Sequence, residues 1–219
     1  MTNVIIIPAR GGSKRLPEKN LLEFGGLPLI AHSINYAIAN KAISQDIYVS
    51  TDDAKIKEIA LSYGAKVIDR PGHLADDHAT TVSVLKHALE VLPEPFDNVI
   101  LLQPTNPLRP EKLLEEAYKA YVENGNDSLM SVSSHRKKLG KIVDGHYSPY
   151  NYTMGQRSQD MEPLYYENGL LYITSAELIK QEKILGLKNM PFIVDHAYST
   201  VDIDTIEDLK YAQFILENF

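Results

Sequence analysis

Short runs of β-branched residues alternate with longer amphipathic segments along most of this chain. Strands are predicted over residues 4–7, 47–50, 66–68, 98–102 and 128–132. Between them, apolar residues recur at helical spacing over 29–38, 56–63, 81–92 and 111–123. This alternation predicts an α/β fold with a doubly wound, mostly parallel sheet that carries helices on both faces.

The expected topology also indicates where a ligand would bind. In open parallel sheets, ligands lie beyond the carboxyl ends of the strands. The segments that follow Ile7, Val49, Ile68 and Leu102 are therefore the first places to look for a site. Because the chain has 219 residues, 44% of them hydrophobic, we expect one core and a single domain over 1–219.

The strand and helix pattern breaks between residues 133 and 163. This stretch is polar and rich in tyrosine, and its first residues include the basic run His135-Arg136-Lys137-Lys138. A loop this long inside a compact domain is usually functional or has structure of its own, so we expect an inserted arm, such as a hairpin. The pattern then resumes with a strand at 169–173, a helix at 176–181, an extended segment at 191–194 and a final helix at 205–217.

Composition excludes several classes of function. The net charge of −7 argues against a general nucleic-acid or anionic-membrane surface, since either partner requires excess lysine and arginine. The absence of cysteine excludes disulfides, thiolate metal sites and a cysteine nucleophile. No apolar run is long enough for a membrane span, and the first residues lack the features of a signal peptide, so we expect a cytoplasmic protein.

A basic, glycine-containing loop follows the first predicted strand. Residues 8–20 read PARGGSKRLPEKN, with four cations and a single carboxylate in a chain that is acidic overall. Paired glycines can present backbone N–H groups to an anion, and arginine and lysine add charge-assisted hydrogen bonds, which together suit a polyphosphate. The loop has neither the Walker A nor the G-x-G-x-x-G pattern, which argues against P-loop ATPases and NAD-dependent dehydrogenases.

Two carboxylates, Asp202 and Asp204, stand two residues apart in a segment expected to be extended. Alternate residues of an extended segment point to the same side, as two ligands of one hard cation would. The structural alternative is that Asp204 or Thr205 caps the final helix, with Glu207 or Asp208 answering as in a capping box. Capping would account for only one of the two carboxylates.

Taken together, these motifs resemble one family in the same order along nearly the whole chain. The glycine loop looks like the signature of the acylneuraminate cytidylyltransferases, the CMP-sialic acid synthetases. The further matching segments are Ser50-Thr51-Asp52, Arg70-Pro71 with Leu74-Ala75, Leu102 to Arg109, Tyr166-Glu167-Asn168-Gly169 and Asp202-Ile203-Asp204-Thr205. The resemblance implies a Rossmann-like nucleotidyltransferase whose inserted arm mediates dimerisation.

The resemblance also implies roles for individual residues. CTP would be bound by Arg10, Gly11, Gly12, Ser13, Lys14, Lys19, Asn20, Arg70 and Thr81. The sugar acid would be bound by Gln103, Thr105, Arg157, Asn168 and Tyr172, with Arg157 meeting its carboxylate. Asp202 and Asp204 would bind Mg²⁺, and the catalytic set would be Arg10, Lys14, Lys19 and Asp204.

The reaction implied is attack by the C2 hydroxyl of a nine-carbon, sialic-acid-like sugar acid on the α-phosphorus of CTP, with release of pyrophosphate. No protein nucleophile is required, and Mg²⁺ is the expected cofactor. Leu102-Gln103-Pro104-Thr105 resembles sialic and legionaminic acid enzymes more than pseudaminic acid ones, and does not separate the first two. We expect a homodimer in which residues 133–163 help to complete the partner's sugar pocket.

Two alternatives remain open at this point. The first is a cytidylyltransferase for 3-deoxy-octulosonate, although Gly11-Gly12-Ser13-Lys14 fits its usual loop less well. The second is a non-catalytic nucleotide-binding or protein-interaction module on the same fold, since fold does not imply function. The sugar pocket also departs from the family pattern at Gln156 to Asp160 and at Leu170-Leu171, which leaves the exact sugar undetermined.

Overall fold

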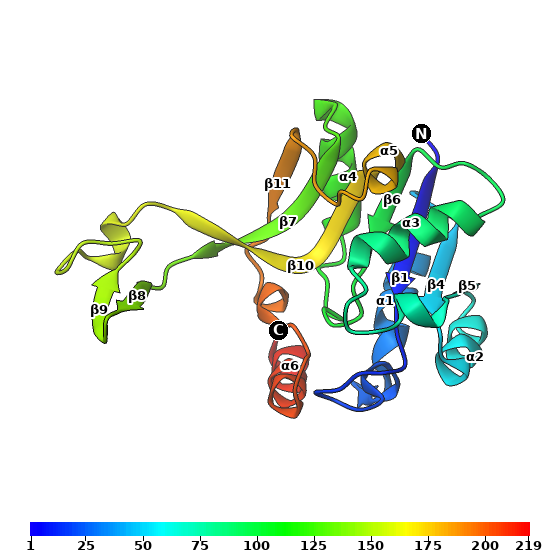
Figure 1. Ribbon diagram of the computed structural model, residues 1–219, viewed down its shortest axis with the longest axis horizontal. Coiled ribbons are helices and arrows are strands. Elements are labelled where there is room, and N and C mark those ends of the chain that lie inside the picture. The colour runs from blue at the N-terminus through cyan, green and yellow to red at the C-terminus, as the bar shows by residue number, and fades with distance from the viewer.

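A seven-stranded sheet forms the centre of the protein in the computed structural model, which describes residues 1–219 (Figure 1). Its strand order is β11-β7-β10-β6-β1-β4-β5. Only β10 runs antiparallel to its neighbours, while every other adjacent pair is parallel. The strands are β1 (Asn3–Pro8), β4 (Ile47–Thr51), β5 (Lys66–Asp69), β6 (Asn98–Leu101), β7 (Ser128–His135), β10 (Leu164–Ser175) and β11 (Asn189–Ile193).

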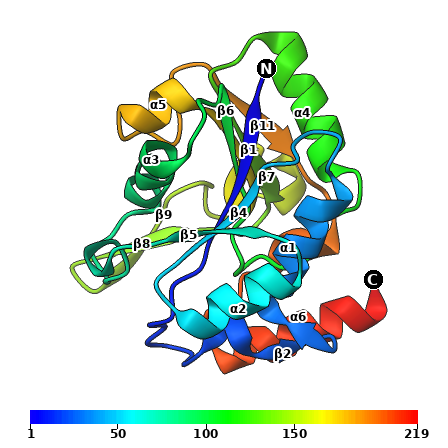
Figure 2. The same cartoon turned by 90° about the vertical axis from the view of Figure 1, so that its right-hand side faces the viewer.

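Helices cover both faces of this sheet, as the alternating sequence pattern predicts (Figure 2). On β1, Ile5 and Ile7 pack in the core formed with α1 (Leu29–Ala39), α2 (Ala54–Ser62) and α4 (Leu113–Asn124). Val4 and Ile6 pack in a second core, with α3 (Thr81–Val91) and α5 (Ala176–Lys180). The side chains of Val4 to Ile7 are all fully buried. Successive residues of a strand point to opposite faces, and both faces of this sheet are covered by helices.

The last helix, α6 (Ile206–Asn218), belongs to a third, smaller core beyond the sheet. That core includes Phe24 from the short hairpin formed by β2 (Glu23–Phe24) and β3 (Leu27–Pro28), which the sequence did not predict. A capping box begins the helix: the Asp208 N–H donates to Thr205 Oγ1 at 3.2 Å, and the Thr205 N–H donates to Asp208 Oδ2 at 2.8 Å. Thr205 is therefore the cap, and Asp204 is not needed for this purpose.

The predicted excursion is a hairpin that projects away from the body of the protein (Figure 1). It contains β8 (Gly140–Val143) and β9 (His146–Pro149), paired antiparallel. The sheet continues further toward the arm than the sequence indicated, because β7 extends to His135. Strand β10 carries the chain back and is interrupted by a register shift between Glu167 and Tyr172. No helix combines the length and apolar character needed to cross a bilayer.

Candidate active site

Two adjoining pockets open where the parallel strands end. The first pocket has a volume of about 530 Å³ and is formed mainly by the segments after β1, β5 and β6 and by the start of α3. Its lining contains ten of the residues expected to act on substrate or metal: Arg10, Ser13, Lys14, Lys19, Asn20, Arg70, Thr81, Gln103, Thr105 and Asp204. Residues separated widely in sequence are thus brought to one edge of the sheet, where the topology predicts a site.

The glycine loop is fixed by contacts with the residues that follow β4 and by a hydrogen bond within the loop. The Gly11 N–H donates to Asp52 Oδ1 at 3.0 Å, and the Asn20 side chain donates to the Arg10 carbonyl at 3.0 Å. A Cβ at Gly11 would lie 2.7 Å from Asp53 Oδ2, so a side chain there would force the loop to move. Gly12 has open space around it. Neither glycine lines the first pocket, and Gly11 uses its N–H within the protein.

Two cations of the loop pair with one carboxylate across the first pocket. Arg10 Nη1 lies 3.1 Å from Asp77 Oδ1, and Lys14 contacts the other oxygen of the same carboxylate. The hydrogen bond from Lys14, with a further contribution from Arg10, holds the pKa of Asp77 below its usual range. The Asp77 carboxylate therefore lies between Arg10 and Lys14 and offsets part of their positive charge.

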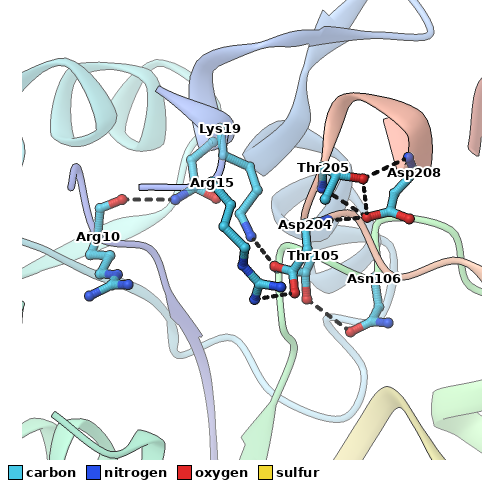
Figure 3. A network of polar contacts seen from close by, with 9 residues as sticks. Arg10, Arg15, Lys19, Thr105, Asn106, Asp204, Thr205 and Asp208 are labelled. Carbon is cyan, nitrogen blue, oxygen red and sulfur yellow. Dashed lines mark hydrogen bonds and ion pairs between the residues drawn. The ribbon is translucent and has the colours of Figure 1, made fainter. Parts of the chain in front are cut away.

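The other two loop cations meet Asp204 (Figure 3). Arg15 Nη2 lies 2.6 Å from Asp204 Oδ2, and Lys19 Nζ lies 2.8 Å from Asp204 Oδ1. The Lys19 side chain is only 13% exposed, whereas that of Arg15 is 71% exposed. The Lys19 ammonium is therefore better shielded from solvent than the Arg15 guanidinium. Dissolved salt screens the interactions of a shielded charge less than those of an exposed one.

Arg70 presents a buried cation to the first pocket without a carboxylate partner. Its Nε donates to Ser50 Oγ at 3.2 Å, and its Nη2 donates to the Ser50 carbonyl. Burial lowers the pKa of Arg70 to about 10, so the guanidinium is still charged near neutral pH. These bonds hold Arg70 against β4 and leave a positive charge at the pocket wall.

The second pocket, of about 960 Å³, shares Gln103 and Thr105 with the first. Tyr172 lines it and donates its hydroxyl to Glu167 Oε2 at 3.0 Å. Burial, with the Glu167 charge beside it, raises the pKa of Tyr172, so this hydroxyl stays protonated. Burial likewise raises the pKa of Asp202, which lines the same pocket.

Asn168 has its side-chain amide bonded inside the protein. Its oxygen accepts from Ser131 Oγ at 2.5 Å and from the Leu170 N–H at 3.2 Å, and its nitrogen donates to Ser133 Oγ at 3.0 Å. The residue is 5% exposed, although it contributes to the lining of the second pocket. Its observed contacts are therefore structural.

Arg157 is the one expected sugar-binding residue that lies apart from the others. It sits on the arm, outside the lining of both pockets, and its Nε pairs with Asp160 at 2.7 Å. Gln103, Thr105, Asn168 and Tyr172 do come together in the second pocket.

Sequence reasoning assigned no role to several residues that line these pockets. The second pocket is lined by the basic residues His135, Arg136 and Lys137 and also by Glu167. These three basic residues are visible in the sequence as a charged run at the start of the arm. Asp76 and Asp77 line the first pocket and follow the Leu74-Ala75 motif directly. Nothing in the sequence alone indicates that Asp77 would pair with Arg10 and Lys14.

We expect Asp77→Asn to lower the KM for a phosphate-bearing substrate by about two- to fivefold, the range set by one exposed ion pair. The reason is that a neutral amide competes less well than the carboxylate for Arg10 and Lys14. Initial rates across a substrate titration measure this. Asp76→Asn is the matched control, because Asp76 Oδ1 accepts from the His78 and Ala79 N–H groups, both at 2.8 Å, and has no ion pair. Equal KM values for both variants and the parent would contradict the competition.

Comparison with known proteins identifies the family. Residues 4–217 match the family described as Cytidylyltransferase, so the chain belongs to that family. It is 33% identical to a pseudaminic acid cytidylyltransferase of Campylobacter jejuni, over 98% of this chain and 96% of the relative. It is 33% identical to a CMP-N,N'-diacetyllegionaminic acid synthase of Legionella pneumophila, over 99% and 97%. It is 35% identical to an N-acylneuraminate cytidylyltransferase of Streptococcus agalactiae, over 95% of this chain and 52% of the relative.

The fold is also found among solved structures. A CMP:2-keto-3-deoxy-manno-octonic acid synthetase in complex with CTP superposes with a TM-score of 0.74 over 99% of both chains. Because the two sequences are only 18% identical, this likeness establishes the α/β fold with its mixed, mostly parallel sheet and carries no substrate assignment.

Proposed function

We propose that this chain transfers CMP from CTP to the anomeric C2 hydroxyl of a nonulosonic acid and releases pyrophosphate. The observation that carries the proposal is the pair of adjoining pockets that share Gln103 and Thr105, one lined by loop cations and the other by mixed polar groups. The first suits a triphosphate, and the second suits a hydroxylated acid. Membership of the cytidylyltransferase family supports CTP as the donor.

In the proposed reaction, the acceptor hydroxyl oxygen forms a bond to the α-phosphorus as the bond from that phosphorus to pyrophosphate breaks, and the hydroxyl proton leaves to solvent. Arg10, Lys14 and Lys19 would offset the charge on the phosphate oxygens, which is the main requirement of phosphoryl transfer. Ion pairs with Asp77 and Asp204 hold these cations near the pocket before the nucleotide arrives. The remaining proposed nucleotide contacts are Gly11, Gly12, Ser13, Asn20, Arg70 and Thr81.

The carboxylates present fit a magnesium ion. Asp204 lines the first pocket and Asp202 lines the adjoining second pocket, and the charge of Asp204 adds to the larger effect of burial in raising the pKa of Asp202. No cluster of three or more histidine, cysteine, aspartate or glutamate side chains is present, so the two carboxylates would need further ligands from outside the protein to hold the ion. Two carboxylates completed by phosphate oxygens and water is the arrangement Mg²⁺ commonly adopts. When bound, the ion would withdraw charge from the phosphates and lower the pKa of the attacking hydroxyl.

Within the second pocket, the basic residues would surround the carboxylate of the sugar acid, together with an Arg157 side chain. Arg136 and Lys137 provide the positive charge, and Glu167 and Asp202 provide acceptors for sugar hydroxyls. The identity of the sugar is left among sialic, legionaminic and pseudaminic acids. Identities of 33% to 35% to enzymes named for all three do not rank them, so the expectation against pseudaminic acid stays untested.

Pyrophosphate release tests the proposal directly. We expect turnover with CTP and Mg²⁺ in the presence of at least one of the three nonulosonic acids, and little turnover when ATP or GTP replaces CTP. A parallel reaction with 3-deoxy-octulosonate separates the alternative acceptor class. Equal rates with ATP would contradict the donor assignment. CTP binding without turnover of any acid would favour a non-catalytic nucleotide-binding module.

We further propose that the protein is a homodimer whose arm, residues 133–163, starts at the chain's own second pocket, which Ser134 to Lys137 line, and reaches the partner's second pocket with its far end. The arm exposes apolar side chains that a lone chain leaves in water, among them Ile142, Tyr147 and Tyr150, which are 72%, 50% and 65% exposed. Arg157 lies on this arm, outside the pockets of its own chain. An arm that crosses to the partner would bring Arg157 to the partner's second pocket.

Arg157→Ala is therefore expected to raise the KM for the sugar acid by about tenfold or more with little change in the KM for CTP, because a carboxylate contact is lost. Light scattering on the same samples should give the mass of a dimer for parent and variant. Arg157→Lys, which keeps the charge but not the planar fork, should lie between them. A fully active monomer would contradict the dimer, and a selective loss of CTP affinity would contradict the assignment of Arg157.

A further inference from the structure

Two buried polar residues, Asn106 and Arg109, lie next to Gln103 and Thr105, the residues that the two pockets share; Asn106 contributes to the lining of the second pocket, and Arg109 lies outside both. Both belong to the segment from Leu102 to Arg109 and have no role in the site described above. They are 2% and 6% exposed, and neither carries an ion pair. Buried polar groups of this kind are costly unless they are fully hydrogen-bonded, so their partners show what they hold together.

Arg109 connects three elements through its guanidinium. Its Nη2 donates to the Gln103 carbonyl at 2.8 Å, its Nε to the Leu170 carbonyl at 2.7 Å, and its Nη1 to Ser33 Oγ at 3.0 Å. Burial lowers the pKa of Arg109 to about 10, which leaves it charged near neutral pH. Since an apolar side chain of similar size can often replace a buried charge without loss of stability, stability alone does not account for a cation here.

Asn106 makes a second connection beside the first. Its Nδ2 donates to the Val201 carbonyl at 2.8 Å and to the Asn168 carbonyl at 3.1 Å. Its Oδ1 accepts from Thr105 Oγ1 at 3.2 Å, a contact drawn in Figure 3. One amide therefore joins the pocket wall to β10 and to the segment that leads to Asp202 and Asp204.

Gly169 shows how closely these parts are fitted. A Cβ at this position would lie 2.6 Å from Asn106 Oδ1, and the backbone has a φ of +74°, in the left-handed region that glycine favours. The turn of β10 next to Asn168 thus packs directly against the Asn106 side chain. The Ile203 N–H adds a backbone bond to the Thr105 carbonyl at 2.8 Å.

From these contacts we infer that Asn106 and Arg109 are positioning residues, which fix Gln103 and Thr105 relative to β10 and to the Val201–Asp204 segment. The inference rests on the proposed function, in which the shared wall aligns the acceptor hydroxyl with the α-phosphorus. Neither side chain lines the first pocket, the proposed CTP site, whereas Asn106 contributes to the lining of the second, so loss of either side chain should leave CTP binding largely unchanged. A displacement of about 1 Å between reacting groups can lower a rate on the order of 100-fold.

Arg109→Lys and Asn106→Ser test this inference, and Ser33→Ala is the matched control. The control removes the one Arg109 partner that lies on α1, away from both pockets. We expect Arg109→Lys and Asn106→Ser to lower kcat by about 10- to 100-fold, while the Kd for CTP, measured by calorimetry without acceptor, changes less than about threefold. Ser33→Ala should keep kcat within about twofold of the parent, even if its melting temperature falls as far as those of the two test variants.

The outcomes separate positioning from stability. A parental kcat in both test variants, measured well below their melting temperatures, would overturn the inference. A loss of kcat in Ser33→Ala equal to that in Arg109→Lys would also overturn it, because destabilisation would then explain the effect. If Arg109→Lys does not fold, Asn106→Ser alone decides by the same criteria. Failure of the parent protein to turn over any acid would instead contradict the proposed function on which the inference rests.

Discussion

Asp204→Asn is expected to lower kcat by on the order of 100-fold or more and to raise the Mg²⁺ concentration needed for half-maximal activity. Asparagine has the same shape as aspartate but is a far poorer ligand for a hard cation. Folding should be little affected, because the cap of α6 is Thr205 and not Asp204. Initial rates over a magnesium titration, together with thermal melts, measure both quantities.

Asp208→Ala is the control, and we expect it to lower stability without changing the magnesium requirement. Asp208 completes the capping box and accepts hydrogen bonds from the Asp204 and Thr205 N–H groups at 3.1 and 2.8 Å. Its loss should lower the melting temperature by about 2–4 °C and leave the magnesium requirement unchanged. Near-parental activity and an unaltered magnesium titration in both Asp202→Asn and Asp204→Asn would remove the metal site.

The pH dependence of activity follows from the environment of Asp202. Burial, with Asp204 nearby, raises its pKa, and only the ionised carboxylate can bind a cation. As the pH falls through this raised pKa, Asp202 takes up a proton and activity should fall, at a pH above the usual aspartate range. A pH profile of kcat/KM at an Mg²⁺ concentration well below saturation measures this, because saturating Mg²⁺ would compete with the proton for Asp202. An acid limb that persists unchanged in Asp202→Asn would assign it to another group.

Lys19→Ala is the second substitution for which we expect a large effect, a fall in kcat on the order of 100-fold. Its ammonium is shielded from solvent and held beside Asp204, where it would stabilise charge that develops on the phosphates. Lys19→Arg should recover part of the loss. Lys55→Ala is the control, since Lys55 pairs with Glu18 on the exposed side of the same loop and lies outside both pockets. An unchanged kcat in Lys19→Ala would contradict a catalytic role for this lysine.

The order of strands and helices could be predicted because hydrophobic periodicity reports burial directly. The direction of β10 could not, since a strand buried on both faces reads the same in either direction. Inserted antiparallel between β6 and β7, it makes the sheet mixed where the rest is parallel. Similarly, the sequence left Asp204 and Thr205 as alternative caps, and the choice depends on the approach of Asp208 to Thr205, a matter of backbone geometry.

The sheet topology predicted that a site lies after the carboxyl ends of the strands, and most residues that line the first pocket do follow β1, β5 or β6. The roles of the individual residues were expected from the family resemblance alone and stay predictions. The contacts of Asp77, Asn106 and Arg109 were not predictable, since they depend on distances between segments that are remote in sequence. Arg157 illustrates a further limit: a motif indicates a residue type at a position but not how far an arm carries it from its own pocket.

The wall formed by Gln103 and Thr105 has a consequence for inhibition. Because both pockets open on these two residues, a single compound that carries a cytidine phosphate at one end and an acidic sugar mimic at the other could occupy both. Tethering makes the second binding event intramolecular, so the bisubstrate compound should bind far more tightly than either fragment.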